Sequence, residues 1–159
     1  MSIAFIYLWF LRLLCLSILF SCHEFNAKLS TLNVRGLGNA TNQKFIFDYV
    51  SNSKSDFVFL QETLVSRLDA IDSLRSKWSG KSFWSPALGK QGGVAILVSP
   101  TTDFDVLQWK EDTSGRMLTV MARAGKINYN FVNIYAPTNT SERKRFFRNY
   151  YWLFLSELC

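Results

Sequence analysis

The chain has 159 residues, 48% of them hydrophobic and 16% aromatic, and carries a formal net charge of +6. This composition excludes an intrinsically disordered chain, and the length suffices for one domain with a hydrophobic core. The basic charge and a pI near 9.4 favour a polyanionic partner such as nucleic acid. The three cysteines, Cys15, Cys22 and Cys159, have no zinc-type spacing, so the sequence indicates neither a disulfide framework nor a structural metal.

The first 22 residues are almost continuously apolar. Arg12 is the one charged residue between Ser2 and Phe20. This length suits a signal sequence or a membrane span, in which a central arginine costs roughly 2.5–3.5 kcal/mol. An incidental apolar extension, translated in frame with the rest, is the alternative. Residues 23–27 are predicted to be a linker, and His23 to be a solvent-exposed residue within it.

The next part of the chain alternates between strands and helices. We predict a strand over 28–33, a helix over 43–51, a buried strand over 56–61 and an amphipathic helix over 65–78. Glycines close the first strand, and a Ser-Asn-Ser stretch ends the first helix.

The second half of the chain is rich in strands. Turn signals separate five strand-like segments, at 82–85, 93–99, 103–111, 116–124 and 126–135. Ala124-Gly125-Lys126 is a hairpin candidate between the last two. A basic helix is predicted over 141–158. Together these elements indicate a layered α/β architecture.

Polar residues stand where three apolar strands end. Asn33 ends the first strand, Gln61-Glu62 follows the second, and Tyr135 lies in the string Asn133-Ile134-Tyr135-Ala136-Pro137. Polar side chains at the ends of several buried strands line a pocket at the rim of a sheet. An amide, a carboxylate and a phenol at that rim could hold a hard cation and a phosphate.

The strings N-V-R-G-L, Q-E-T, G-G-V-A-I-L-V, G-R and N-I-Y-A-P-T follow one another in this order, ahead of the basic helix. In this order they resemble the endonuclease/exonuclease/phosphatase superfamily, and most of all the apurinic-type endonuclease domain of LINE-type (non-LTR) retrotransposon polyproteins. The resemblance runs from about residue 28 to residue 158. It implies a four-layered α/β sandwich, with two mixed β-sheets flanked by helices. We expect residues 28–159 to be the N-terminal half to two-thirds of that domain, truncated, and to supply about one of its sheets.

The resemblance implies a role for each motif residue. Glu62 would be the metal ligand, Asn33 would contact the metal-bound water or the scissile phosphate, and Tyr135 would donate a hydrogen bond to the phosphate. Taken from the residues alone, Glu62 is more simply a solvated residue at a strand end, Asn33 a turn or capping residue, and Tyr135 an aromatic residue closing the core. The metal implied is Mg²⁺, with Mn²⁺ as an alternative, and no small-molecule cofactor is implied.

Four further residues are candidate substrate contacts. Arg35 either touches DNA or forms a salt bridge, and Arg116 is either a strand contact or a structural hydrogen-bond donor. Thr138 occupies the place of a phosphate-contacting asparagine in many relatives, and Asn139 follows it.

The resemblance implies Mg²⁺-dependent hydrolysis of DNA phosphodiester bonds, as in the endonuclease domain of a retrotransposon reverse-transcriptase protein. No G-D-F-N string and no later Ser-Asp-His string follow within the 159 residues, so we expect the isolated chain to have little or no nuclease activity. We also expect the loss of half of the sheet pair to expose Ile96, Val98, Phe131 and Val132.

Two other functions stay open. One is another phosphoesterase of the superfamily, directed to DNA repair or to lipid phosphate. The other is a non-enzymatic, membrane-anchored remnant that contacts a membrane through residues 2–20. A retroelement fragment would be intracellular or nuclear, whereas a genuine targeting segment over residues 1–22 would direct the chain to a membrane or to secretion.

Overall fold

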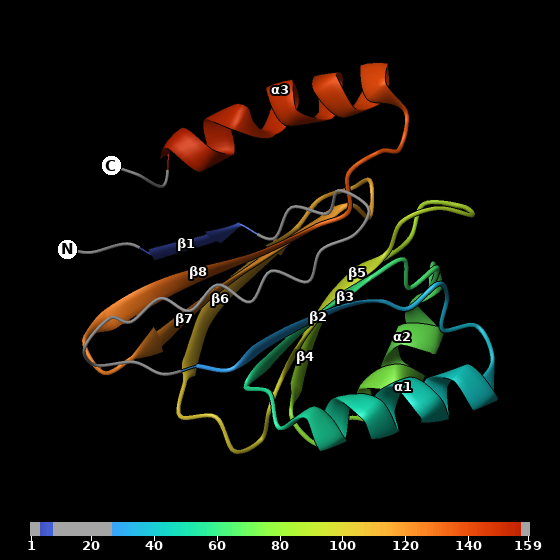
Figure 1. The fold of residues 1–159 in the computed structure, drawn as a ribbon, viewed down its shortest axis with the longest axis vertical. Helices are drawn as coiled ribbons and strands as arrows, with labels where there is room; N and C mark the ends of the chain where they lie inside the picture. The colour runs from blue at the N-terminus through green and yellow to red at the C-terminus, as the bar shows by residue number, and fades with distance from the viewer. Residues whose placement is uncertain (1–3, 8–26, 157–159) are drawn as a thin grey trace.

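Two four-stranded β-sheets pack face to face and form the centre of the molecule (Figure 1). The structure is a computed structural model that describes residues 4–7 and 27–156. One sheet has the strand order β2-β3-β5-β4 and the other β1-β8-β7-β6. The strands are β1 Ala4–Tyr7, β2 Leu29–Asn33, β3 Phe57–Gln61, β4 Lys81–Ser85, β5 Val94–Val98, β6 Asp105–Glu111, β7 Met117–Ala124 and β8 Ile127–Ile134.

Both sheets are mixed. In the first sheet β2 runs parallel to β3, and β5 is antiparallel to both β3 and β4. In the second sheet β1 runs parallel to β8, while β6, β7 and β8 form an antiparallel meander. The tight turn after Ala124 joins β7 to β8, which confirms the predicted hairpin.

Side chains of the central strands alternate between two hydrophobic cores. On β3, Phe57 and Phe59 point between the two sheets, while Val58 and Leu60 point toward the helices. The rings of Phe57 and Phe131 stack between the sheets with their centroids 4.1 Å apart. Because β3 is covered on both faces, its sequence is apolar from Phe57 to Leu60 and does not alternate.

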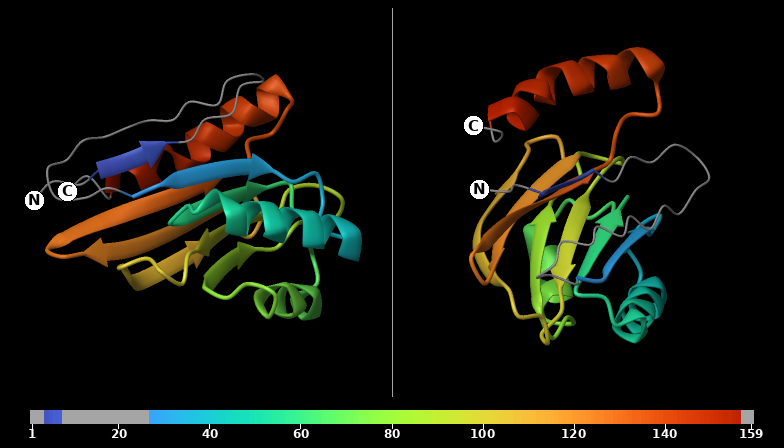
Figure 2. Two further views of the ribbon diagram at one scale, coloured as in Figure 1. Left: turned by 60° about the horizontal axis from the view of Figure 1, so that its bottom comes forward. Right: turned by 60° about the vertical axis from the view of Figure 1, so that its left-hand side comes forward.

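Helices form the two outer layers. Helices α1 (Ala40–Ser53) and α2 (Leu68–Arg75) cover the outer face of the first sheet with buried residues such as Ile46 and Ile71. Helix α3 (Thr140–Ser156) lies on the far side of the second sheet, as two further views show (Figure 2). This order of layers confirms the predicted α/β sandwich.

One expectation about the fold is wrong. The chain supplies two sheets and not about one, because residues 105–134 build β6, β7 and β8 against the first sheet. The apolar side chains that we expected to be exposed are therefore buried, and Ile96, Val98 and Phe131 belong to the core between the sheets. Their exposed fractions are 0% for Ile96, 3% for Val98, 1% for Phe131 and 8% for Val132.

The predicted elements all form, with small shifts in their bounds. Helix α2 is shorter than the predicted 65–78, because the backbone carbonyl of Val65 accepts a hydrogen bond from Ala87 N (2.8 Å) and holds that residue in a loop. Strand β1 was not expected. Several other predictions concern parts of the chain outside the described residues. These are the rest of the 1–22 segment, the linker up to residue 26 with His23, and the three cysteines. Within the described part of the chain, no helix has the length and apolar character needed to span a bilayer.

Candidate functional site

Glu62 and Tyr135 meet at the rim between the two sheets. The hydroxyl of Tyr135 donates a hydrogen bond to Glu62 Oε1 over 2.8 Å. Glu62 directly follows β3 and Tyr135 directly follows β8, so one residue comes from each sheet. Both are half-buried. Two of the three motif residues predicted for catalysis are therefore in direct contact.

The backbone at Glu62 is in an unusual conformation. Its φ angle is +53°, in the left-handed region that residues other than glycine rarely adopt. Two hydrogen bonds fix the turn on either side, from Gly36 N to Glu62 O (2.7 Å) and from Thr63 N to Gly93 O (3.0 Å). Strain of this kind persists where the surrounding structure enforces it, and it often accompanies a functional residue.

The phenol of Tyr135 holds its proton strongly. Burial, followed by the hydrogen bond to Glu62 and the negative charge of that carboxylate, raises the pKa of Tyr135 to about 12. The guanidinium of Arg116 lies 5.4 Å from the centre of the Tyr135 ring and acts in the opposite direction. At neutral pH the phenol is therefore a hydrogen-bond donor at this rim.

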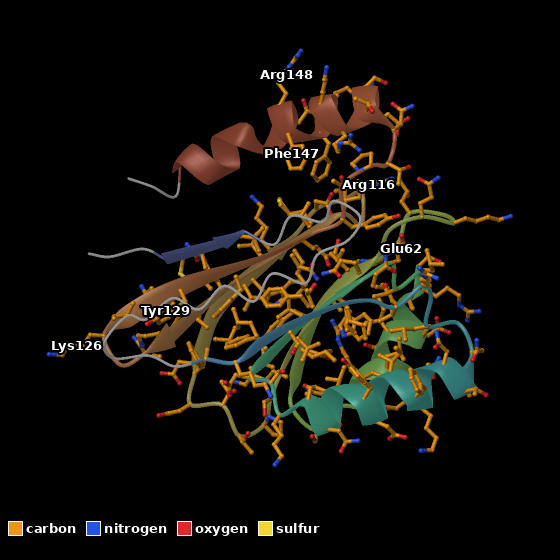
Figure 3. The ribbon with its side chains drawn as sticks, in the orientation of Figure 1. Glu62, Arg116, Lys126, Tyr129, Phe147 and Arg148 are labelled. Atoms are coloured by element: carbon orange, nitrogen blue, oxygen red, sulfur yellow. The ribbon has the colours of Figure 1, made fainter. Side chains whose placement is uncertain are left out.

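Arg116 makes structural hydrogen bonds in this arrangement. Its Nη2 donates to Gln91 Oε1 over 3.0 Å, and its Nη1 donates to the backbone carbonyl of Tyr135 over 3.4 Å. It lies on the same rim as Glu62 (Figure 3). Of the two readings that the sequence left open, the structural one has direct contacts, and contact with a substrate stays a prediction.

Asp112 is a supporting residue that the sequence reasoning missed. Its Oδ1 accepts hydrogen bonds from the backbone N–H groups of Arg116 (2.8 Å) and Met117 (2.9 Å), and from Ser85 Oγ (3.2 Å). These bonds form the turn that delivers Arg116 to the rim. The sequence Asp112-Thr113-Ser114-Gly115 is the signal that could have revealed it, because aspartate favours turns in which its side chain accepts backbone N–H groups.

Asn33 lies beside the strand that leads to Glu62. It pairs with Gln61 in the register of β2 and β3. Its Oδ1 accepts a hydrogen bond from Arg35 N over 3.2 Å, which is the turn role that the sequence also allowed. Arg35 is exposed, and no ion pair involves it among the described residues. The proposed roles of Asn33 and Arg35 toward a substrate stay predictions.

Thr138 and Asn139 lie at the start of α3. The side-chain oxygen of Asn139 caps the helix, accepting from Ser141 N (2.9 Å) and Glu142 N (3.2 Å). The backbone carbonyl of Thr138 accepts a hydrogen bond from Arg143 Nη1 (3.1 Å). Both residues are exposed, and their contact with a phosphate also stays a prediction.

The oxygen donors at the rim fit a hard cation in part. In the described part of the chain, no group of three or more His, Cys, Asp or Glu side chains could hold a metal. Mg²⁺ needs only one or two protein carboxylates, because it retains water and takes phosphate oxygens. Glu62 supplies one carboxylate, and Asn33 is an oxygen donor on the neighbouring strand.

The sequence profile of the endonuclease/exonuclease/phosphatase family matches residues 30–157. The chain belongs to this family. One relative is the uncharacterized 149 kDa protein of transposon TX1 from Xenopus laevis, which is 32% identical to this chain over 122 residues. The matched region is 76% of this chain and 9% of that protein. The predicted family, and the likeness to transposon proteins, are confirmed.

Solved structures agree with the family fold. The catalytic domain of Xenopus laevis APE2 superposes with a TM-score of 0.58 at 18% identity, covering 79% of this chain and 51% of that one. The AP endonuclease LMAP of Leishmania major gives 0.59 at 18% identity, covering 77% and 44%. Truncated Caenorhabditis elegans TDP2 gives 0.57 at 26% identity, covering 80% and 53%. The chain thus spans about half the length of these structures. Nucleases of this superfamily are generally metal-dependent.

Proposed function

We propose that this chain carries the part of a LINE-type retrotransposon endonuclease that binds Mg²⁺ and the scissile phosphate of DNA. The observation that carries the proposal is the hydrogen bond between Tyr135 and Glu62, which places a phenol donor and a carboxylate at one rim. The curated relative is a transposon protein, and this favours a retroelement nuclease over a repair enzyme or a lipid phosphatase. The solved AP endonucleases are less than 25% identical and support the fold alone.

Glu62 would hold the metal, and Asn33 would contact it through water. Bound Mg²⁺ supplies charge that polarises the phosphate and stabilises the developing negative charge. Tyr135 keeps its proton at neutral pH, since its pKa is raised to about 12. Its single O–H now points at Glu62, so an incoming phosphate oxygen would compete with the carboxylate for that donor. Arg116 keeps the ring in place during this exchange.

The basic face of α3 would hold the DNA backbone. Exposed Lys144, Arg145 and Arg148 follow the half-buried Arg143 on this helix. Arg148 points away from the sheets (Figure 3). Since phosphate contacts release counterions, neutralising four phosphates would weaken binding about a hundredfold between 50 and 200 mM salt.

Fluorescence anisotropy with a labelled DNA duplex tests the proposal. We expect Mg²⁺ to strengthen binding by the wild-type chain and to have no such effect on Glu62→Gln. Replacing the four basic residues of α3 with glutamine should abolish most of the salt dependence. The matched control replaces Lys44 of α1 and Lys54, which directly follows α1, with glutamine and should leave both properties unchanged. Equal Mg²⁺ effects on the wild type and on Glu62→Gln would contradict the proposal.

A further inference from the structure

Two carboxamide side chains occupy core positions between the sheets. On β3 the residues that face the second sheet are Phe57, Phe59 and then Gln61; on β8, Phe131 is followed two residues later by Asn133. Alternation thus predicts apolar side chains at both amide positions. Gln61 is only 5% exposed and Asn133 only 1%. Polar residues at core positions are costly unless they are fully hydrogen-bonded.

The two amides bond to each other and across the sheets. Gln61 Nε2 donates to Asn133 Oδ1 over 2.7 Å. Asn133 Nδ2 donates to the backbone carbonyls of Leu60 (2.9 Å) and Ala95 (2.8 Å), which belong to two strands of the opposite sheet. Thr31 Oγ1 donates to Gln61 Oε1 over 3.2 Å. Each carboxamide therefore has partners for both its oxygen and its nitrogen. We call the pair Gln61 and Asn133 the amide clasp.

The amide clasp lies next to the candidate site in both strands. Gln61 directly precedes Glu62, and Asn133 stands two residues before Tyr135. The bond from Tyr135 to Glu62 crosses the same gap between the sheets as the clasp does. Apolar packing alone permits small slides between sheets, whereas directional amide bonds to Leu60 O and Ala95 O fix one register.

We propose that the amide clasp is a positioning device, which holds the two sheets in the one register that brings Tyr135 to Glu62. The clasp residues touch neither metal nor substrate, and their importance for catalysis rests on the function proposed above. A purely structural role predicts something different. In that case, removing the clasp would lower the stability of the whole sandwich and leave the contact between Tyr135 and Glu62 intact in every variant that still folds.

Fluorine NMR of the full chain, labelled with 3-fluorotyrosine, separates these roles without metal or DNA. The Tyr135 signal is assigned with Tyr135→Phe, and its response to Glu62→Gln measures the contact. The clasp variants are Asn133→Leu, which removes the amide at similar size, and Gln61→Met, which keeps the bonds of Asn133 to the opposite sheet. Ile96→Val is the matched control, since it loosens the same core without touching the clasp.

We expect the response of the Tyr135 signal to Glu62→Gln to fall to less than about half in folded Asn133→Leu, because the two sheets lose their fixed register. In Gln61→Met the response should stay above half, since Asn133 keeps its bonds to Leu60 O and Ala95 O. The Ile96→Val control should keep the full response at a lower stability. A full response in folded Asn133→Leu would overturn the proposal. If Asn133→Leu fails to unfold cooperatively, the clasp holds the core as a whole, and that result also overturns the narrower role. If the clasp variants behave as expected but the wild-type chain binds neither metal nor DNA, only the proposed function is wrong.

Discussion

A carboxylate and a protonated phenol from opposite sheets are hydrogen-bonded to each other at the candidate site. The hydrogen bond of 2.8 Å between Tyr135 and Glu62 uses one carboxylate oxygen as acceptor. In the proposed function, the carboxylate would be a ligand for a hard cation and the phenol a donor for a phosphate oxygen. Arg116 adds positive charge beside the ring at 5.4 Å. The phenol donor and the guanidinium complement the negative charge of a phosphodiester, whereas the carboxylate would do so only through a bound cation.

The raised pKa of Tyr135 makes the free energy of unfolding depend on pH in the alkaline range. The folded pKa is about 12 and the ordinary value is 10.0, so the folded chain retains a proton that the unfolded chain loses. The stabilising effect is complete below pH 10 and is lost as pH rises to about 12. We expect the free energy of unfolding of the wild type to fall more steeply over this range than that of Tyr135→Phe. Urea denaturation at a series of pH values measures the difference, and parallel curves would contradict the assignment.

At the scale of elements, the turn after β3 depends on the glycines of the β4–β5 connection. Gly93 has a φ of +77°, and a Cβ atom built there would lie 2.2 Å from Thr63 Oγ1. Thr63 is itself buried, at 1% exposure, directly after Glu62. The absence of a side chain at Gly93 is therefore what lets the loop after β3 approach β5 and hold Glu62 in its left-handed conformation.

We expect Gly93→Ala to lower the free energy of unfolding by about 3 kcal/mol or more, since it adds a steric clash to backbone strain. Gly89→Ala is the matched control, because Gly89 also has a positive φ (+67°) but has open space around it. It should cost only about 1 kcal/mol. Urea denaturation gives both values. Equal losses at the two positions would show that the contact with Thr63 does not matter.

The sequence predicted the elements better than their assembly. Local apolar patterns revealed every strand from β2 to β8, since each pattern lies within a few residues. Which sheet a strand joins depends on contacts between distant residues, and for this reason the second sheet was missed. Strand β1 was missed because continuous apolar sequence does not distinguish a strand from a membrane or signal segment.

The site was predictable in its residues but not in its contacts. Glu62 and Tyr135 stand at motif positions that the family resemblance identified. Their bond joins residues 73 positions apart, and no local pattern encodes it. The capping role of Asn139 has a local signal, since asparagine ahead of a helix favours its N-terminus. The bonds of Asn133 to β3 and β5 have none, because they depend on how the sheets face each other.

At the scale of the whole molecule, we expect the chain to bind Mg²⁺ and DNA without efficient catalysis, because the described residues supply only part of the proposed metal site. The described residues offer Glu62 at the rim and no cluster of three metal-binding side chains. Among the described residues, no such cluster surrounds Glu62 to help activate water. We expect little or no nicking of supercoiled plasmid by the isolated chain with Mg²⁺, measured by gel electrophoresis. Clear nicking that disappears in Glu62→Ala would refute this expectation.

Electron paramagnetic resonance of Mn²⁺ tests whether Glu62 forms the proposed cation site of this chain. Free Mn²⁺ is titrated with the wild type, with Glu62→Gln and with Asp48→Asn, which removes an exposed carboxylate of α1. We predict that Glu62→Gln weakens Mn²⁺ binding at least about tenfold, while Asp48→Asn leaves it unchanged. Equal binding by the wild type and by Glu62→Gln would show that Glu62 is not a ligand of the cation.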